Sequence, residues 1–165
     1  MPRQEPHTRA DYSAFQTIST RWMDNDVYGH VNNVVYYSYF DTAVNGYLME
    51  HGVLDFRAGT TVGLVVETGC QFFSPIAFPD TVTAGIRVAK IGTSSVRYEV
   101  GLFANESEVA AAQGHFVHVY VDANDHGYSG AGQARVATQS FLVPVLPVND
   151  APTISLPSQA LVAAE

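Results

Sequence analysis

The spacing of hydrophobic residues changes along the chain, and each change marks a predicted element. Residues 13–23 alternate loosely between polar and apolar positions, which predicts a first β-strand. Over residues 33–49 the apolar side chains instead recur at helical spacing, at Tyr36, Phe40, Val44 and Tyr47. Gly52 lies where the C-terminal cap of this helix is expected. The pattern therefore predicts one strand followed by one long helix.

Four further segments are rich in β-branched and aromatic residues and are separated by turn-forming residues. They cover residues 61–73, 80–91, 94–104 and 108–122, and we predict that they are strands. We expect them to follow one another in a meander-like, antiparallel arrangement. With the first strand they predict an α+β fold in which an antiparallel sheet of about five strands wraps around one long central helix.

The length of the chain, 165 residues, suits a single domain, and a composition that is 47% hydrophobic supplies a core. We expect residues 1–12 to form a flexible N-terminal tail and residues 13–140 to form the domain. Residues 141–165 are expected to be a C-terminal extension whose prolines exclude a regular helix.

Charge and cysteine content exclude several classes of function. The chain has 16 Asp and Glu residues against 8 Lys and Arg, a formal net charge of −8, which disfavours nucleic-acid binding. The single cysteine, Cys70, cannot form an intrachain disulfide, and no Cys/His cluster has zinc-site spacing. No apolar run resembles a signal peptide or a membrane span. We expect a cytoplasmic protein that binds neither membrane nor nucleic acid and uses no metal.

Polar residues gather between the first predicted strand and the helix. Residues 24–33 include two carboxylates, a glycine, a histidine and, directly before the helix, an asparagine pair, namely Asp24, Asp26, Gly29, His30, Asn32 and Asn33. The helix that follows is mostly apolar and will be buried, so polar side chains at its entry must be hydrogen-bonded or must face a ligand. We interpret this junction as the active site.

The same junction resembles the signature of the hotdog-fold acyl-CoA thioesterases of the 4-hydroxybenzoyl-CoA thioesterase type. That signature is an Asp-x-Asp-x-x-Gly-His-Val-Asn-Asn run that opens the central helix, and residues 24–33 match it. Residues 91–96 and 119–122 resemble later strands of the family more weakly. The resemblance covers roughly residues 13–122 and implies a hotdog fold.

The resemblance also implies roles for individual residues. Asp26 would be the nucleophile or the general base, and the backbone N–H of Asn33 would stabilise the oxyanion at the helix N-terminus. Gly29 would let the backbone approach the thioester closely. His30 would orient the loop, bind the substrate or act as a base. The remaining predicted contacts with the acyl and coenzyme A parts of the substrate come from Asn32, Tyr36, Lys90 and Arg97.

Each of these residues also has a structural interpretation. Asp24 and Asp26 can be turn or N-cap residues, Asn32 and Asn33 can cap the helix, and helix aromatics belong to a core by default. Tyr28 stands where some relatives, such as the plant acyl-carrier-protein thioesterases, carry an Asn, so a mechanism that uses that Asn does not transfer. Cys70 has no His partner that would make it a nucleophile.

The resemblance therefore predicts an enzyme that hydrolyses a fatty or aromatic acyl-CoA to free acid and coenzyme A. It implies no organic cofactor, because coenzyme A belongs to the substrate. It also implies a homodimer or homotetramer with the active site at the dimer interface. Two alternatives stay open at this point: an acyl-carrier-protein thioesterase, which the acidic surface disfavours because carrier proteins are acidic too, and a non-catalytic domain that binds acyl thioesters.

Overall fold

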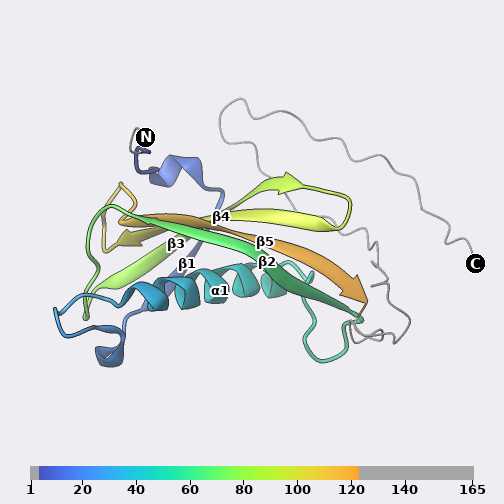
Figure 1. Cartoon of the computed structure of the whole chain (residues 1–165), viewed down its shortest axis with the longest axis horizontal. Coiled ribbons are helices and arrows are strands. Elements are labelled where there is room, and N and C mark those ends of the chain that lie inside the picture. Colours follow the sequence, from blue (N-terminus) through green and yellow to red (C-terminus); the bar gives the residue numbers. More distant parts are fainter. Residues whose placement is uncertain (1–3, 123–165) are drawn as a thin grey trace, which may run out of the picture.

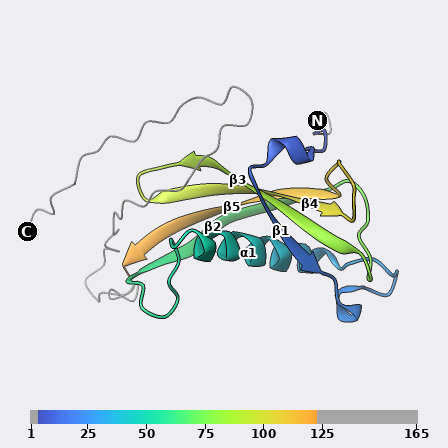
Figure 2. The same cartoon turned by 180° about the vertical axis from the view of Figure 1, so that it is seen from behind.

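The computed structural model describes residues 4–122 and consists of one long helix packed against one antiparallel sheet. The strands are β1 (Ala14–Ser19), β2 (Thr61–Phe72), β3 (Thr81–Ile91), β4 (Ser95–Ala104) and β5 (Ala112–Asp122), and the helix is α1 (Asn33–Glu50). The sheet lies over α1 and curves around it (Figure 1, Figure 2). The predicted α+β fold, with a sheet wrapped around one central helix, is confirmed.

The predicted helix is confirmed almost to the residue. Its first residue is Asn33, and Gly52 follows its C-terminus in the left-handed conformation, with φ of 67°. The first predicted strand is shorter than expected, because the chain leaves the strand after Ser19 and forms a short 3-10 helix at Trp22–Asp24. A polar Asp24 that caps this turn explains why the alternation of residues 13–23 does not continue as a strand.

The order of the strands differs from the predicted meander. The sheet order is β1-β3-β4-β5-β2, so only β3, β4 and β5 follow one another as neighbours. Strand β2 pairs with β5 instead of β3, and the connection between β2 and β3 crosses the end of the sheet. Every pairing is antiparallel, as expected. Local hydrophobic patterns identify strands but do not specify which strands pair, and this accounts for the difference.

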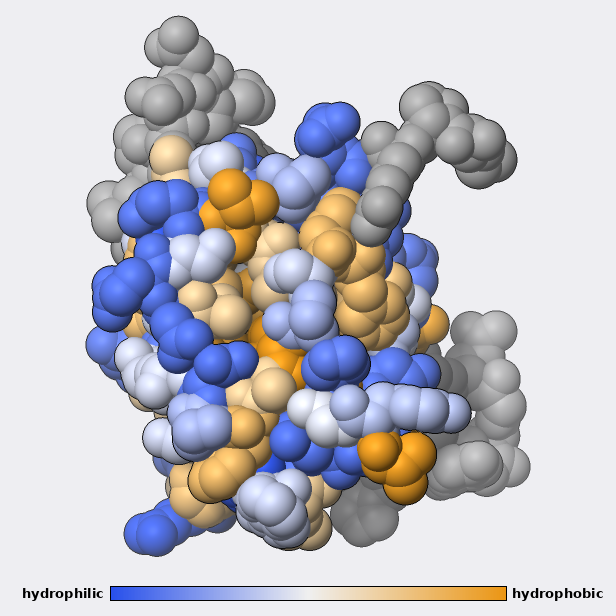
Figure 3. All heavy atoms as spheres, turned by 90° about the vertical axis from the view of Figure 1, so that its left-hand side faces the viewer, coloured by the Kyte–Doolittle hydropathy of each residue, from blue (hydrophilic) through white to orange (hydrophobic). Residues whose placement is uncertain are grey.

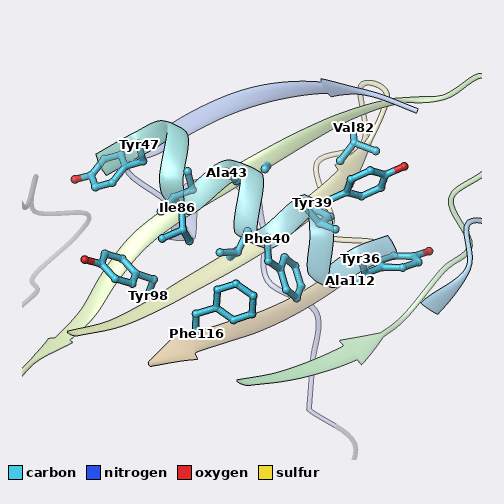
Figure 4. Close-up of a cluster of buried hydrophobic side chains, with 14 of the residues drawn as sticks. Tyr36, Tyr39, Phe40, Ala43, Tyr47, Val82, Ile86, Tyr98, Ala112 and Phe116 are labelled. Carbon is cyan, nitrogen blue, oxygen red and sulfur yellow. The ribbon is translucent and has the colours of Figure 1, made fainter. Parts of the chain in front are cut away.

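The core lies between α1 and the concave face of the sheet. Figure 4 shows Tyr36, Tyr39, Phe40 and Tyr47 of the helix among side chains of the sheet. Phe40 and Tyr98 are completely buried, and the rings of Phe40 and Phe116 meet edge to face, with centroids 6.2 Å apart. Such aromatic contacts each contribute about 1 kcal/mol beyond the burial of apolar area. They fix the helix on the sheet and thereby fix both of its ends.

The N-terminal segment differs from the flexible tail that we expected, at least over residues 7–12. It lies on the face of the sheet opposite α1 (Figure 2). Thr8 forms a β-bridge with Val109, and the Tyr12 side chain is only 4% exposed. Tyr12 fits there because Gly85 and Gly101, which are cross-strand neighbours, leave the space that side chains would fill. The predicted C-terminal extension, residues 141–165, lies outside the described residues, as does the end of the predicted domain.

No helix among the described residues has the length and apolarity that crossing a bilayer requires.

Candidate active site

Asp26 lies in a tight loop between β1 and α1. Asn25 and Val31 pair as an isolated antiparallel bridge, which closes this loop at its base. Inside it, the Asp26 N–H donates to the His30 carbonyl at 2.8 Å, and the Gly29 N–H donates to the Asp26 carbonyl at 3.1 Å. Gly29 has φ of 80°, a conformation that glycine adopts without strain. The loop therefore holds the Asp26 backbone in one position.

The Asp26 carboxylate is held by one of its two oxygens. Oδ1 accepts hydrogen bonds from the backbone N–H of Tyr28 at 2.8 Å and of His30 at 3.4 Å. Oδ2 forms no hydrogen bond with any residue that the structure describes. Backbone donors thus orient the carboxylate, while Oδ2 stays available for chemistry.

The N-terminus of α1 lies beside this carboxylate. Asn32 is the N-cap, and its side-chain oxygen accepts the Val34 N–H at 3.2 Å. The Asn32 N–H in turn donates to the Asp24 carbonyl at 2.8 Å. Among residues 4–122, the Asn33 N–H has no intrachain acceptor, as expected for the first position of a helix. A free backbone donor at the positive end of the helix dipole can stabilise a negatively charged oxygen.

Asp26, His30, Asn33 and Tyr36 line one open cavity of about 380 Å³. Its other wall comes from the end of β2 and the residues after it, with Phe72, Phe73, Ser74 and Pro75. Figure 3 shows this end of the molecule, where apolar side chains lie among polar ones. Tyr36, which is only 3% exposed and belongs to the aromatic core, also lines this cavity. The structure thus joins four of the predicted site residues around one space.

Asp24, the other carboxylate of the motif, is buried and has a structural role. Its oxygens accept hydrogen bonds from the Arg21 N–H at 2.7 Å, from Arg21 Nε at 3.0 Å and from the Tyr39 hydroxyl at 2.7 Å. Burial alone would raise the pKa of Asp24, but the hydrogen bonds from Tyr39 and Arg21 outweigh it and lower that pKa. Asp24 is therefore an ionised anchor for the loop, in line with its interpretation as a turn residue.

Gly29 and Asn32 shape the site without lining the cavity, through the loop conformation and the helix cap described above. Lys90 and Arg97 lie away from it. Lys90 is exposed near the end of β3, and Arg97 forms ion pairs with Glu67 at 3.2 Å and with Glu99 at 3.6 Å. Arg97 alternates with the buried Val96 and Tyr98, so it points to the face of the sheet opposite α1. Contact of these two cations with coenzyme A stays a prediction.

Glu67 and Cys70 carry two further groups that could take part in chemistry. Glu67 is exposed on the edge strand β2, and a hydrogen bond from His115 at 2.9 Å, with a second from Arg97, lowers its pKa. It does not line the cavity of Asp26. Burial raises the pKa of the Cys70 thiol to about 12, so this thiol stays protonated and is a poor nucleophile. Asp26 is therefore the acidic group placed for chemistry in this cavity.

Sequence reasoning missed the wall formed by residues 72–75 and the anchor Tyr39. Residues 74–80 were visible only as a turn, and nothing local shows that the Ile76 carbonyl accepts the Val31 N–H at 2.7 Å. Tyr39 belongs to the helix aromatics, but its partner lies 15 positions earlier in the chain. Aromatic spacing alone does not identify such a partner.

The sequence model of the thioesterase superfamily matches residues 28–111, about half of the chain. The chain belongs to the thioesterase superfamily. The long α-helix inside a five-stranded antiparallel sheet, as residues 4–122 form it, is the hotdog fold, which confirms the fold that the motif implied. The match begins at Tyr28 and so includes Gly29, His30 and the start of α1.

Individual superfamily relatives and similar structures support this assignment. PA5185 from Pseudomonas aeruginosa is 48% identical, with a TM-score of 0.73 over 82% of this chain and 89% of that one. XC229 from Xanthomonas campestris, described as a candidate acyl-CoA thioesterase, is 25% identical, with a TM-score of 0.61 over 75% of this chain and 98% of its own. YsmA from Bacillus subtilis is 25% identical over 96 residues, 58% of this chain. That match spans 63% of YsmA, less than two thirds of its length.

Proposed function

We propose that this protein hydrolyses acyl-CoA thioesters to a free acid and coenzyme A. The observation that carries the proposal is that Asp26 and Asn33, the first residue of α1, line the same cavity. Membership of the thioesterase superfamily and the similarity to XC229 support it. Thioester hydrolysis needs an activated nucleophile next to a donor for the carbonyl oxygen, and these two groups supply both.

The proposed reaction places the thioester carbonyl oxygen at the Asn33 N–H. As general base, Asp26 Oδ2 takes a proton from a water molecule, whose oxygen attacks the carbonyl carbon. The carbon–sulfur bond then breaks, and the thiolate of coenzyme A leaves and gains a proton. The backbone donors to Oδ1 keep the carboxylate in place during this step. His30 lines the cavity and would contact the leaving group.

As nucleophile, Asp26 Oδ2 would instead attack the carbonyl carbon itself. This step forms a mixed anhydride on Asp26 and releases coenzyme A, and water then cleaves the anhydride. The two routes differ in one observable species. Rapid quenching of a single turnover, followed by mass spectrometry of the peptide that contains Asp26, would show the acyl adduct on the nucleophilic route and none on the general-base route.

We further propose that the enzyme is a homodimer that forms through β2. Within residues 4–122 this strand is one of the two edges of the sheet, and its apolar side chains are exposed, with Leu64 50% and Val66 60% accessible. Unpaired strand edges of this kind readily pair with another chain. Phe72, at the end of β2, lines the cavity of Asp26, so a second copy paired here would lie beside the active site.

The net charge of the chain and the proposed reaction indicate which acyl carrier the enzyme uses and whether it needs a cofactor. The net charge of −8 opposes docking of an acidic carrier protein, which favours acyl-CoA as the substrate. The proposed reaction uses only a carboxylate, a backbone donor and water, so it requires no metal or organic cofactor. Competition between an acyl-CoA and the matching acyl-carrier protein in one assay tests the choice of carrier.

The proposal is tested by release of free thiol from a panel of short, medium, long-chain and aromatic acyl-CoAs. We expect turnover of at least one class that exceeds spontaneous hydrolysis, and the panel identifies that class. Tight binding of acyl-CoA without thiol release would show a binding domain instead. Sedimentation velocity of the wild type and of Val66→Lys tests the dimer: we expect a dimer and a monomer respectively, and a monomeric wild type would overturn this part.

A further inference from the structure

A second, smaller cavity lies at the opposite end of α1 from Asp26. It has a volume of about 50 Å³ and is bounded by the C-terminal half of α1, the segment after it and the strands β2 and β5. Its lining residues include Leu48, Thr61, Gly63, His118 and Tyr120. A space of this size holds a few water molecules or the last atoms of a bound chain.

His118 is the unusual residue of this cavity. Its side chain is 3% exposed, yet neither Nδ1 nor Nε2 has a hydrogen-bond partner among the described residues. Burial lowers the pKa of His118, so at neutral pH the imidazole offers one donor and one acceptor. Buried polar groups normally have hydrogen-bond partners. Two ring nitrogens that lack partners and border a cavity therefore indicate a bound ligand or bound water.

Glycine on the neighbouring strand lies directly against this ring. Gly63 pairs with Tyr120 across the β2–β5 ladder. A Cβ atom at Gly63 would lie 3.1 Å from His118 Nδ1 and 3.2 Å from a ring carbon of Tyr120. Any larger side chain at this position would therefore crowd His118. Glycine at this position lets the His118 ring pack against β2.

The neighbouring tyrosines do not satisfy His118. The hydroxyl groups of Tyr98 and Tyr120 hydrogen-bond to each other at 2.6 Å, and the Tyr98 ring contacts the His118 ring with centroids 5.3 Å apart. Figure 4 shows Tyr98 at the end of the core near Tyr47 and away from Tyr36. The aromatic groups thus form the walls around His118 and leave its nitrogens to whatever fills the cavity.

An acyl group bound at Asp26 does not reach this cavity within one chain. The two cavities are lined by α1 at Tyr36 and at Leu48, roughly 18 Å apart along the helix axis. Phe40, which lies between these two positions of the helix, packs edge to face on Phe116 of β5. A dimer changes this relation, because a two-fold axis at the β2 edge makes the paired strands antiparallel. The Thr61 end of one β2 then lies beside the Phe72 end of the other.

We propose that the cavity at His118 receives the distal end of the acyl group whose thioester lies at Asp26 of the second copy, and that His118 recognises a hydroxyl group there. A hydroxyl donates to the acceptor nitrogen of the imidazole or accepts from its N–H, which matches what the ring leaves unpaired. This inference rests on the proposed function and on the dimer, and it narrows the substrate class to hydroxylated acyl groups.

The test compares matched substrates that differ by one hydroxyl group. Two pairs are measured: ω-hydroxyacyl-CoAs against unsubstituted acyl-CoAs of equal length, and hydroxybenzoyl-CoAs against benzoyl-CoA. For one of these pairs we expect the wild type to prefer the hydroxylated member by about tenfold or more in kcat/KM, since a buried polar group discriminates strongly against a ligand that leaves it unpaired. His118→Phe should abolish the preference. His115→Phe, on the opposite face of β5, should retain it.

Two additional measurements make the result decisive. Gly63→Ala fills the cavity from β2 and should also reduce the preference, so the test does not depend on His118→Phe alone. Nitrogen NMR of the His118 imidazole in the wild type should show shifts when the hydroxylated product acid is added, and none with the unsubstituted acid. Equal kcat/KM for both members of each pair, with no such shifts, would show that the cavity holds water only and would overturn the inference while hydrolysis stands. Absence of hydrolysis throughout the panel would instead contradict the proposed function. The NMR shifts would then show on their own whether a hydroxylated acid binds at His118.

Discussion

The Tyr39 hydroxyl donates a hydrogen bond of 2.7 Å to Asp24 Oδ2, and this contact connects α1 to the loop that carries Asp26. The Asp24 carbonyl also accepts the N–H of Asn32, the residue that caps the helix. One buried carboxylate residue therefore holds both halves of the site, the loop with Asp26 and the helix start with Asn33.

Removal of the Tyr39 hydroxyl should loosen this connection. Tyr39→Phe keeps the ring in the core but leaves a buried acceptor on Asp24 without its donor, so we expect a loss of about 1–3 kcal/mol in the free energy of unfolding. Urea denaturation measures this loss, and kcat should fall as well because the loop shifts. Tyr37→Phe is the matched control, since it lies in the same helix without a hydroxyl contact among residues 4–122. Equal effects of the two variants would contradict the role of Tyr39.

The ionised state of Asp24 predicts a pH dependence of stability. Its pKa in the folded protein is lowered below the unfolded value of about 3.9, so its stabilising contribution is present above that value. The contribution is lost as the pH falls through the lower pKa of the folded state. Asp24→Asn should therefore destabilise the protein by about 2 kcal/mol at pH 7, and the difference from the wild type should shrink below about pH 4. Denaturation curves from pH 7 to pH 3 test this; a difference that does not change with pH would contradict it.

The backbone donor of Asn33 can be removed separately from its side chain. Proline is tolerated at the first position of a helix and has no N–H, and Asn32 already has the extended conformation, with ψ of 140°, that precedes a proline. We expect Asn33→Pro to fold but to lose on the order of 100-fold to 1,000-fold in kcat. Asn33→Ala, which keeps the N–H, should retain most of the activity. Comparable kcat values for both variants would exclude the Asn33 N–H as the oxyanion donor.

Alanine substitutions of two glycines at opposite ends of α1 distinguish an effect on catalysis from a general effect of backbone strain. Gly29 has φ of 80° and Gly52 has φ of 67°, and an added Cβ at either position would lie more than 4 Å from the groups of residues 4–122 around it. Alanine at either position should cost about 1 kcal/mol of stability through backbone strain alone. Only Gly29→Ala should reduce kcat/KM, because only that loop positions Asp26. A similar loss of activity in Gly52→Ala would indicate a general effect of destabilisation.

The elements themselves could be predicted from local pattern. Helical spacing of Tyr36 and Phe40, and a capping glycine at position 52, are properties of neighbouring residues, so the helix was predicted with nearly correct ends. The strand order could not be predicted in this way, because pairing of β2 with β5 depends on contacts between residues about 50 positions apart, such as Cys70 and Gly114. The packing of Tyr12 over Gly85 was hidden for the same reason.

The residues of the candidate site also differ in whether local sequence could predict their positions. Asp26, His30 and Asn33 lie within eight positions of one another, so the motif brings them together by local geometry, and the structure places all three at one cavity. Lys90 and Arg97 were chosen for their charge and their place in the sequence, but the pleat of β4 directs Arg97 away from the helix. The unpaired His118 has no local signal at all, because burial of its ring depends on three strands and α1.

The most direct test of the account is the rate of thiol release by Asp26→Asn on the best acyl-CoA of the panel. The amide is nearly isosteric and can still accept hydrogen bonds from the Tyr28 and His30 backbones, but it supplies neither a base nor a nucleophile. Asp41→Asn, an exposed change on α1, is the control and should keep the wild-type rate. We predict that Asp26→Asn folds, assembles like the wild type and loses at least about 100-fold in kcat. A folded Asp26→Asn variant with wild-type turnover would contradict the central role of this carboxylate.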